Sequence, residues 1–333
     1  FGASGTVLSV FSRTVRRRFL ELSAGALVLL VLSAAWAYRG AVLLRPDLQY
    51  VLYSGAEVLR LWAHALALFL PFFFGGLFIG MNLGRFPGTL GIVYGANMAG
   101  SGLGGVAGVG LAFIAGPYRM PGVIALLGVV ALLVWLAAWP EYRDARRRGL
   151  AGSALVVAVG AAAGAIVVSP GSSVDPYKPL AHAERLAEQG DARRLLRRDG
   201  PRARIDVFDV PSVHHTLFTA PGAPAPPSQL SLFVDGAHAG AVFRIDTPDE
   251  AAVLRHTAQS LAYRVIDRPR VLILGETSGV NVWLALAHDA RQVTVVQANP
   301  QLTRVVRAVR EAGGMVAGGA QQKRGASVFD HPA

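Results

Sequence analysis

A short loop with a glycine at each end is the feature of this chain that most suggests binding chemistry. Gly275 follows an apolar run at residues 271–274, and Gly279 precedes a helical pattern at 280–288. Such a run predicts a strand buried on both faces, so the segments form a strand, a tight loop and a helix. Cofactors bind beside loops of this kind, at the carboxyl ends of parallel strands.

A second strand and helix follow and support the same interpretation. The strand is predicted at 292–296, and the helix begins after Asn299 and Pro300, a favoured cap residue and a proline suited to the first turn. The β-α-β-α spacing is about that of the start of a Rossmann-like parallel sheet. Two repeats are too few for a stable sheet covered on both faces, and the chain begins without methionine, so it is expected to be truncated at both ends.

The segment before the loop, residues 170–268, is predicted to be a small β-strand region with flanking helices. Alternating apolar residues predict three strands, at 204–210, 229–236 and 240–245. A helix is predicted at 249–263 and a basic amphipathic helix at 181–198. No aromatic residue interleaves with the arginines of this basic helix to stack on bases, so the sequence favours contact with lipid or solvent over nucleic acid.

The first 169 residues are predicted to be a membrane α-helical bundle. The whole chain is 53% apolar, has no cysteine and carries a formal net charge of +11, which points to a membrane protein with basic flanks rather than a secreted disulfide scaffold. Runs of about 17 to 25 apolar residues can cross the hydrocarbon core of a bilayer. Five such runs are present, at residues 22–38, 61–83, 89–115, 123–139 and 150–168.

Two features of these runs have both a functional and a structural interpretation. Glycines at four-residue spacing in the third run form a helix-packing surface, which we favour over a substrate path. Glu57, Arg60 and His64 share one face at the start of the second run. Headgroup contact explains this stripe better than transport, because no further ionisable residue continues it down the helix.

Basic residues give conflicting evidence on orientation. Clusters at 13–18 and 143–148 precede the first and fifth runs and predict cytoplasmic loops. A fifth crossing would then place the soluble half outside, yet a third basic cluster at 178–198 argues for the inside. We expect the protein to lie in a bacterial inner membrane with its soluble half in the cytoplasm. This orientation requires that one run be re-entrant, and the glycine-rich third run is the best candidate. An external soluble half is the alternative.

Several motifs together resemble those of the integral-membrane relatives of spermidine synthase. In the membrane half, the motifs are residues 71–77, 85–87 and 94–104. In the soluble half, 175–178 resembles the opening motif of the family's soluble part, 232–236 its hairpin and 271–279 its cofactor loop. The combination covers nearly the whole chain and is more specific than a lone glycine loop.

The resemblance implies a polyamine aminopropyltransferase or a methyltransferase-like protein that binds S-adenosylmethionine or its decarboxylated form. An active enzyme would transfer an aminopropyl or methyl group to a small amine acceptor. The residues that would hold the cofactor are Gly275, Glu276, Thr277, Ser278, Gly279 and Gln297. Three regions follow: a transmembrane domain at 1–169, the strands and helices at 170–268, and an incomplete Rossmann-like cofactor domain at 269–333.

Departures from the family pattern leave a second function open. Glu276, Thr277 and Ser278 stand where the family has glycines, and the Glu276 carboxylate would either repel a ligand carboxylate or pair with a cationic group. Gln297 replaces an acid that binds both ribose hydroxyls, and a neutral amide makes weaker bonds. Asn97 stands where an aspartate is expected. The alternative is therefore a non-catalytic membrane sensor or transport component with a degenerate site.

No catalytic base and no metal ligand is assigned from the sequence. In the family, the carboxylate that orients the attacking amine lies beyond the second repeat, and so beyond Ala333. Asp235, His256 and Asp267 are near the expected site, but residues in such places are more often turn, helix-surface or loop residues.

Overall fold

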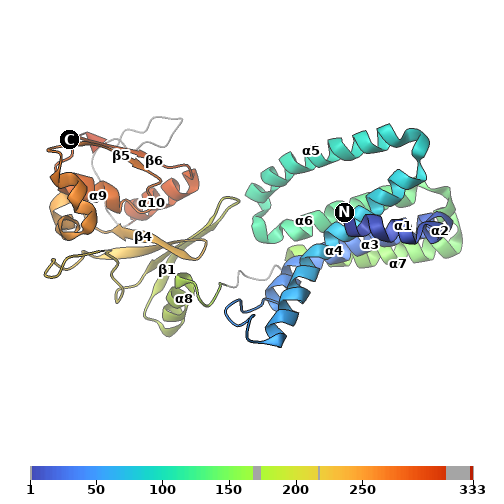
Figure 1. Ribbon diagram of the computed structural model, residues 1–333, viewed down its shortest axis with the longest axis horizontal. Helices are drawn as coiled ribbons and strands as arrows, with labels where there is room; N and C mark the ends of the chain where they lie inside the picture. The colour runs from blue at the N-terminus through green and yellow to red at the C-terminus, as the bar shows by residue number, and fades with distance from the viewer. Residues whose placement is uncertain (1, 168–173, 217, 313–330, 333) are drawn as a thin grey trace. The chain divides into compact units, whose positions relative to one another are not determined.

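The computed structural model describes residues 2–167, 174–216, 218–312 and 331–332. The chain divides into two compact units, Phe1–Ser173 and Val174–Ala333. The first unit is helical, and the second contains two small sheets with helices (Figure 1).

The first unit contains α1 (Gly2–Val10), α2 (Ser12–Arg17), α3 (Phe19–Leu43), α4 (Gly55–Arg85), η1 (Pro87–Thr89), α5 (Leu90–Ala115), η2 (Pro117–Arg119), α6 (Met120–Ala138), η3 (Pro140–Arg143) and α7 (Ala145–Val167). Among the described residues, five helices are long and apolar enough to cross a membrane. The five predicted runs lie within these helices or end one residue beyond them, which supports the predicted transmembrane character by length and composition. The last predicted run ends at Val168, which lies outside the described residues.

Helix α3 is the centre of the helical unit. It packs against α4, α6 and α7, and its Leu27 and Val31 are completely buried together with Leu132 of α6. Gly128 of α6 makes this packing possible, because a Cβ atom there would lie 2.7 Å from Val31 Cγ2. Small residues that let helix backbones approach closely are the usual means of association in lipid.

The glycine-rich helix α5 does not use its small residues for packing within the unit. None of its residues is buried, and in Figure 1 the helix runs apart from the others. Within the described chain no atom lies within 4 Å of a Cβ placed at Gly95 or Gly104. Its 26 residues correspond to about 39 Å of helix, more than the roughly 30 Å hydrocarbon core, and the helix has no re-entrant turn.

The second unit contains α8 (Pro179–Gln189), β1 (Arg193–Asp199), β2 (Arg204–Asp209), β3 (Gln229–Val234), β4 (Ala237–Phe243), η4 (Pro248–His256), η5 (Ala258–Arg264), β5 (Arg270–Leu274), α9 (Val280–Ala287), β6 (Gln292–Val296), α10 (Pro300–Ala312) and β7 (His331–Pro332). Strands β1 to β4 form an antiparallel sheet in sequence order. Strands β5 and β6 are parallel, and β7 pairs antiparallel with β6. The predicted small strand region and the predicted parallel strand pair are both present.

The antiparallel sheet is covered on both faces. Ile205, Val207 and Leu232 on one face pack against Val305 and Val309 of α10. Phe208 and Phe233 on the other face pack against Leu180 and Ala183 of α8. Because α10 follows β6, its packing joins the antiparallel sheet to the parallel strands.

The prediction of one basic helix at 181–198 is wrong. Helix α8 ends at Gln189 because Gly190 adopts a left-handed conformation with φ of +89°, and the amide of Asp191 donates to Leu186 O at 2.9 Å. The arginines that follow lie on edge strand β1 and not on a helix face. Arg194 pairs with Glu184 at 2.5 Å, so part of this charge is neutralised within the unit.

The predicted helix at 249–263 is two 3₁₀ segments, η4 and η5. Thr257 separates them in an extended conformation, and it forms an isolated bridge with Thr219. The first segment begins at Pro248, one residue before the predicted start at Asp249, and Thr247 and Glu250 form a capping box at this end.

We predict that Gly128→Val destabilises the helical unit and that Gly104→Val does not. A side chain at Gly128 must displace the buried Val31, and overpacking of this kind costs about 1–3 kcal/mol. Both glycines lie inside long helices, so the change in helix propensity is the same for both. The measurement is the melting temperature of each variant in detergent, and equal shifts would contradict the close packing of α3 against α6.

Candidate functional site

The Gly275–Gly279 loop connects the carboxyl end of β5 to the start of α9. Gly275 has φ of +76° and Gly279, which caps α9, has φ of +91°. Both values lie in the left-handed region that side chains disfavour, which explains the glycines at the two ends of the loop. The amide of Gly275 donates to Val296 O at 2.9 Å and so joins the loop to the end of β6.

The Glu276 carboxylate fills the centre of the loop. Its Oε1 atom accepts hydrogen bonds from the amides of Thr277 at 3.0 Å, Ser278 at 3.0 Å and Gly279 at 2.7 Å. Consecutive amides at the start of a helix form a site for an anion. In this chain its own carboxylate already occupies these donors, so they are not available to a ligand.

The second oxygen of Glu276 differs from the first. Oε2 is buried and has no hydrogen-bond partner among the described residues, and the residue is only 9% exposed. Its negative charge acts on Tyr263, whose pKa is raised by burial and, to a smaller extent, by Glu276. An oxygen in this state is unusual, because buried charged groups are normally paired.

Glu276, Thr277 and Ser278 line a pocket of about 220 Å³. The remaining lining residues are His215, Thr216, His238, Ala239, Gly240, Ala241, Leu254, Thr257, Gln259, Val280 and Asn281. Strand β4 forms the wall next to the loop: Thr277 Oγ1 donates to Ala239 O, and a Cβ on Gly240 would lie 2.5 Å from Ser278 Oγ. The loop therefore lies so close to β4 that a side chain at Gly240 would clash with Ser278.

Two histidines form another part of the wall. The ring centroids of His215 and His238 are 3.7 Å apart. Burial, and then the neighbouring His215, lowers the pKa of His238 to about 4. Burial and then His214 lower the pKa of His215. Both rings are therefore neutral near pH 7.

Gln297 lies at the end of β6 and holds the loop. Its Nε2 donates to Glu276 O, and its Oε1 accepts from the amide of Asn299 at 2.9 Å. Both ends of the amide group are thus bonded to the protein. The six residues predicted to form the cofactor site lie together at the carboxyl ends of β5 and β6. Two of them, Glu276 and Gln297, use their side chains for hydrogen bonds to backbone groups of the protein, which the sequence did not indicate.

Of the six predicted residues, Glu276, Thr277 and Ser278 line the pocket and the other three do not, and neither do the candidates for a catalytic base. Asp235 is a turn residue with φ of +51°, and its Oδ1 accepts from the amide of Arg204 at 2.8 Å. His256 and Asp267 are exposed. His215 and His238 were missed by the sequence analysis, since no spacing relates them to each other or to the loop.

The polar stripe at the start of α4 is satisfied locally. Glu57 pairs with Arg60 at 2.5 Å and accepts from the amide of Asp47 at 2.8 Å. His64 Nδ1 lies 2.9 Å from Ala41 O. Glu57 and His64 therefore bond to neighbouring parts of the chain and Arg60 bonds to Glu57, while contact of the stripe with lipid headgroups stays a prediction.

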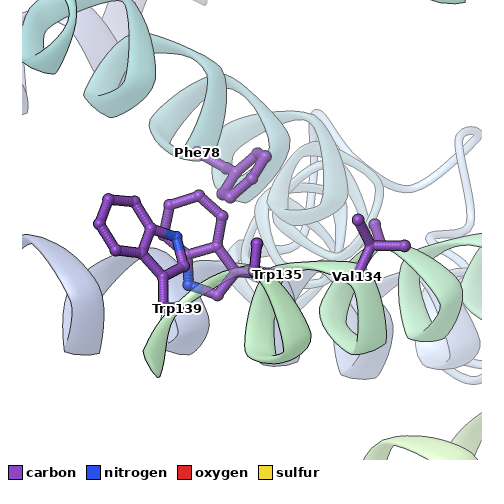
Figure 2. Close-up of a pocket in the computed structure, with 6 residues that line it drawn as sticks. Phe78, Val134, Trp135 and Trp139 are labelled. Atoms are coloured by element: carbon purple, nitrogen blue, oxygen red, sulfur yellow. The ribbon is translucent and has the colours of Figure 1, made fainter. Parts of the chain in front are cut away.

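The helical unit has a separate, aromatic pocket of about 460 Å³ (Figure 2). Its lining residues are Phe78, Ala131, Val134, Trp135, Ala138 and Trp139. Figure 2 shows the rings of Phe78, Trp135 and Trp139 grouped at one end of the pocket, away from Val134. This lining suits an apolar group and supplies no acid or base.

The comparisons with known proteins add no assignment. No family model, no curated protein and no solved structure matches this chain. In the part of the chain that the structure describes, no group of three or more His, Cys, Asp and Glu residues could hold a metal ion. A functional assignment therefore depends on the loop, the pocket and the resemblance of the motifs.

We predict that His238 makes the folded protein less stable in acid. An unfolded chain protonates this imidazole near pH 6.5, whereas the folded protein does so only near pH 4. The stability it contributes is complete above pH 6.5 and is lost as the pH falls toward 4. Allowing for the exposed part of the ring, protonation of His238 lowers the free energy of unfolding by about 1 kcal/mol between pH 7.5 and pH 5. The melting temperature is expected to fall by roughly 2–4 °C over the same range.

The measurement is the melting temperature of the soluble unit in the full chain at these two pH values. His238→Asn should reduce the difference, whereas the control His256→Asn, at an exposed histidine, should leave it unchanged. An unaltered pH dependence in His238→Asn would contradict the lowered pKa.

Proposed function

We propose that this chain is a membrane-anchored, spermidine synthase-like protein whose soluble unit binds a small molecule beside the Gly275–Gly279 loop. The observation that carries the proposal is a pocket lined by the loop at the carboxyl end of a parallel strand pair. Ligands of open α/β sheets bind at this edge. Strand β5, the loop, α9 and β6 have the connectivity expected of the start of a Rossmann-like domain.

The expected ligand is S-adenosylmethionine or its decarboxylated form, and the site residues fit it only in part. The Glu276 carboxylate lies where a ligand carboxylate would be repelled, so the decarboxylated form, which lacks that group, fits better. Gln297 uses both ends of its amide within the chain and is not placed to bind ribose hydroxyls. We therefore derive no transfer step from these residues.

The incomplete fit favours a non-catalytic sensor or transport component over an aminopropyl or methyl transferase. Glu276 and Gln297 are two of the residues that depart from the family pattern, and both form hydrogen bonds to the backbone of the loop. The transferase remains the second candidate, because the order of strand, glycine-bounded loop and helix is the one expected of a cofactor site.

We predict that an adenosyl sulfonium binds weakly to the full chain in detergent and that Glu276→Gly with Gln297→Glu tightens this binding. The first change frees three amides, and the second offers the ribose a charged acceptor worth about 1–2 kcal/mol, or roughly a 5- to 30-fold change in affinity. Isothermal titration with both forms of the cofactor and with plain nucleotides is the measurement.

Gln292→Glu is the matched control, since Gln292 lies at the opposite end of the same strand. It adds the same charge away from the loop and should leave the affinity unchanged. If neither the wild-type chain nor the double variant binds any adenosyl compound, the cofactor proposal is wrong.

We further propose that the soluble unit faces the cytoplasm of a bacterial cell, where adenosyl cofactors are made. Reporter fusions after Arg148 and after Arg204 measure the side of the membrane on which each position lies. A cytoplasmic signal after Arg204 is expected, and a cytoplasmic signal after Arg148 as well would mean that α7 does not cross. A signal from outside the cytoplasm after Arg204 would exclude an intracellular cofactor as the ligand of the soluble unit.

A further inference from the structure

The aromatic pocket of the helical unit opens at the surface of the helix bundle. Its lining residues Val134 and Ala138 are exposed, whereas Trp135 is buried. Phe78 of α4 lies edge-on to Trp135 of α6, with ring centroids 5.3 Å apart, so two helices bound the pocket (Figure 2). A ligand can therefore enter from the side of the bundle, where lipid chains lie in a membrane.

The pocket is long and apolar. Its α6 residues extend from Ala131 to Trp139 on one face of the helix, over about 12 Å. Apart from two indole N–H groups, the lining side chains consist of carbon and hydrogen. The volume of about 460 Å³ is within the roughly 300–1,000 Å³ of small-molecule sites. Shape and lining together suit an extended hydrocarbon chain.

A group of aromatic rings connects the pocket to a cation. Trp139 stacks on Phe86 with ring centroids 6.5 Å apart, and Phe19 lies edge-on to both at 6.0 Å. The guanidinium carbon of Arg85 lies 5.9 Å from the ring centroids of Phe86 and Phe19. One layer of rings therefore separates this cation from the pocket residue Trp139.

The Arg85 side chain is accessible to an anion. It is exposed, and within the described residues its contacts are with the two aromatic rings and not with an acid or another hydrogen-bond acceptor. A guanidinium group has five N–H donors in a planar fork that matches the oxygens of a phosphate group. A phosphate beside Arg85 would therefore lie next to the end of the apolar pocket.

This end of the bundle has the features of a membrane interface. Helices α4 and α6 end here at Arg85 and Ala138, and α3 begins here at Phe19. The hydroxyl of Tyr142 donates to Leu20 O at 2.8 Å, and Trp and Tyr side chains favour the headgroup layer. The groove along α6 therefore runs from the hydrocarbon core to the headgroup layer.

The charge at this end is positive. The acids near the ends of these helices are Glu21, Glu141 and Asp144, and Glu21 pairs with Arg147 at 3.4 Å. They are outnumbered by exposed arginines, which besides Arg85 include Arg13, Arg16, Arg17, Arg18 and Arg148. Basic residues at the membrane surface attract anionic lipids.

We infer that the aromatic pocket binds one acyl chain of an anionic phospholipid and that the phosphate group of the same lipid pairs with Arg85. A zwitterionic phospholipid has a cation next to its phosphate, so it is a poorer partner for an arginine-rich surface. The inference goes beyond the proposed function, because it concerns the helical unit and requires no adenosyl ligand.

The test is quenching of tryptophan fluorescence in the full chain in detergent. Bromine atoms on an acyl chain quench tryptophans that they contact, and Trp135 and Trp139 line the pocket. Phosphatidylglycerol and phosphatidylcholine with the same brominated chains are titrated separately. Phosphatidylglycerol is expected to quench at an about 5-fold lower lipid mole fraction. Coincident titration curves would overturn the inference.

Two pairs of variants locate the site. Arg85→Gln should bring the two lipids within 2-fold of each other, whereas Arg119→Gln, at an exposed arginine before the opposite end of α6, should keep the preference. Ala138→Phe fills the pocket and should weaken quenching by both lipids. Its control is Ala137→Phe, at an exposed residue outside the lining, which should leave quenching unchanged. Equal effects within either pair would overturn the inference.

Glycerol phosphate, which has the charged group without the chains, separates a lipid from a soluble phosphate ligand. It should not reverse the quenching by phosphatidylglycerol, and complete reversal would show that the phosphate alone determines binding and would overturn the inference. If a variant does not fold, the comparison of the two lipids on the wild-type chain still decides.

Discussion

The arrangement of the soluble unit's site depends on three hydrogen bonds accepted by one carboxylate oxygen, Glu276 Oε1. The first amides of a helix and of a left-handed turn have no partner in the backbone and need an acceptor. In nucleotide-binding loops, a ligand anion supplies that acceptor. In this chain, the acceptor belongs to the loop itself, so these three amides are satisfied by the chain, and a carboxylate residue lines the pocket.

The same loop connects parts of the unit that are distant in sequence. Thr277 reaches the backbone of β4 through Ala239, and Gln297 at the end of β6 donates to the backbone of Glu276. Helix α10 begins just beyond β6 and covers one face of the antiparallel sheet. The loop beside the pocket is therefore hydrogen-bonded to β4 of one sheet and to the end of β6 of the other.

The parts that could be predicted from the sequence are those with local signals. The apolar run before Gly275 and the two loop glycines determine β5, the loop and α9. The hairpin of β3 and β4 follows from Asp235 and Gly236, both of which adopt positive φ, at +51° and +82°. The basic segment was predicted incorrectly because its arginines repeat like those of an amphipathic helix, although Gly190 ends the helix before most of them.

The composition of the pocket could not be predicted, because it depends on register and on contacts between distant segments. A register shift in β3 and β4 pairs Leu232 with Gly240 and Phe233 with His238. This shift allows Gly240 to meet Ser278 while His238 stacks near His215. The sequence identified Glu276 as a departure from the family pattern, but only the structure shows that one of its oxygens is bonded to the loop and the other is not.

The two units differ in the polar groups that line their pockets. In the helical unit, Glu57 and His64 contact their immediate surroundings, and the lining of the aromatic pocket has no titratable side chain. In the soluble unit, a fixed carboxylate and two neutral imidazoles line one small pocket. Of these two pockets, only the one beside the loop after β5 is lined by a carboxylate and imidazoles.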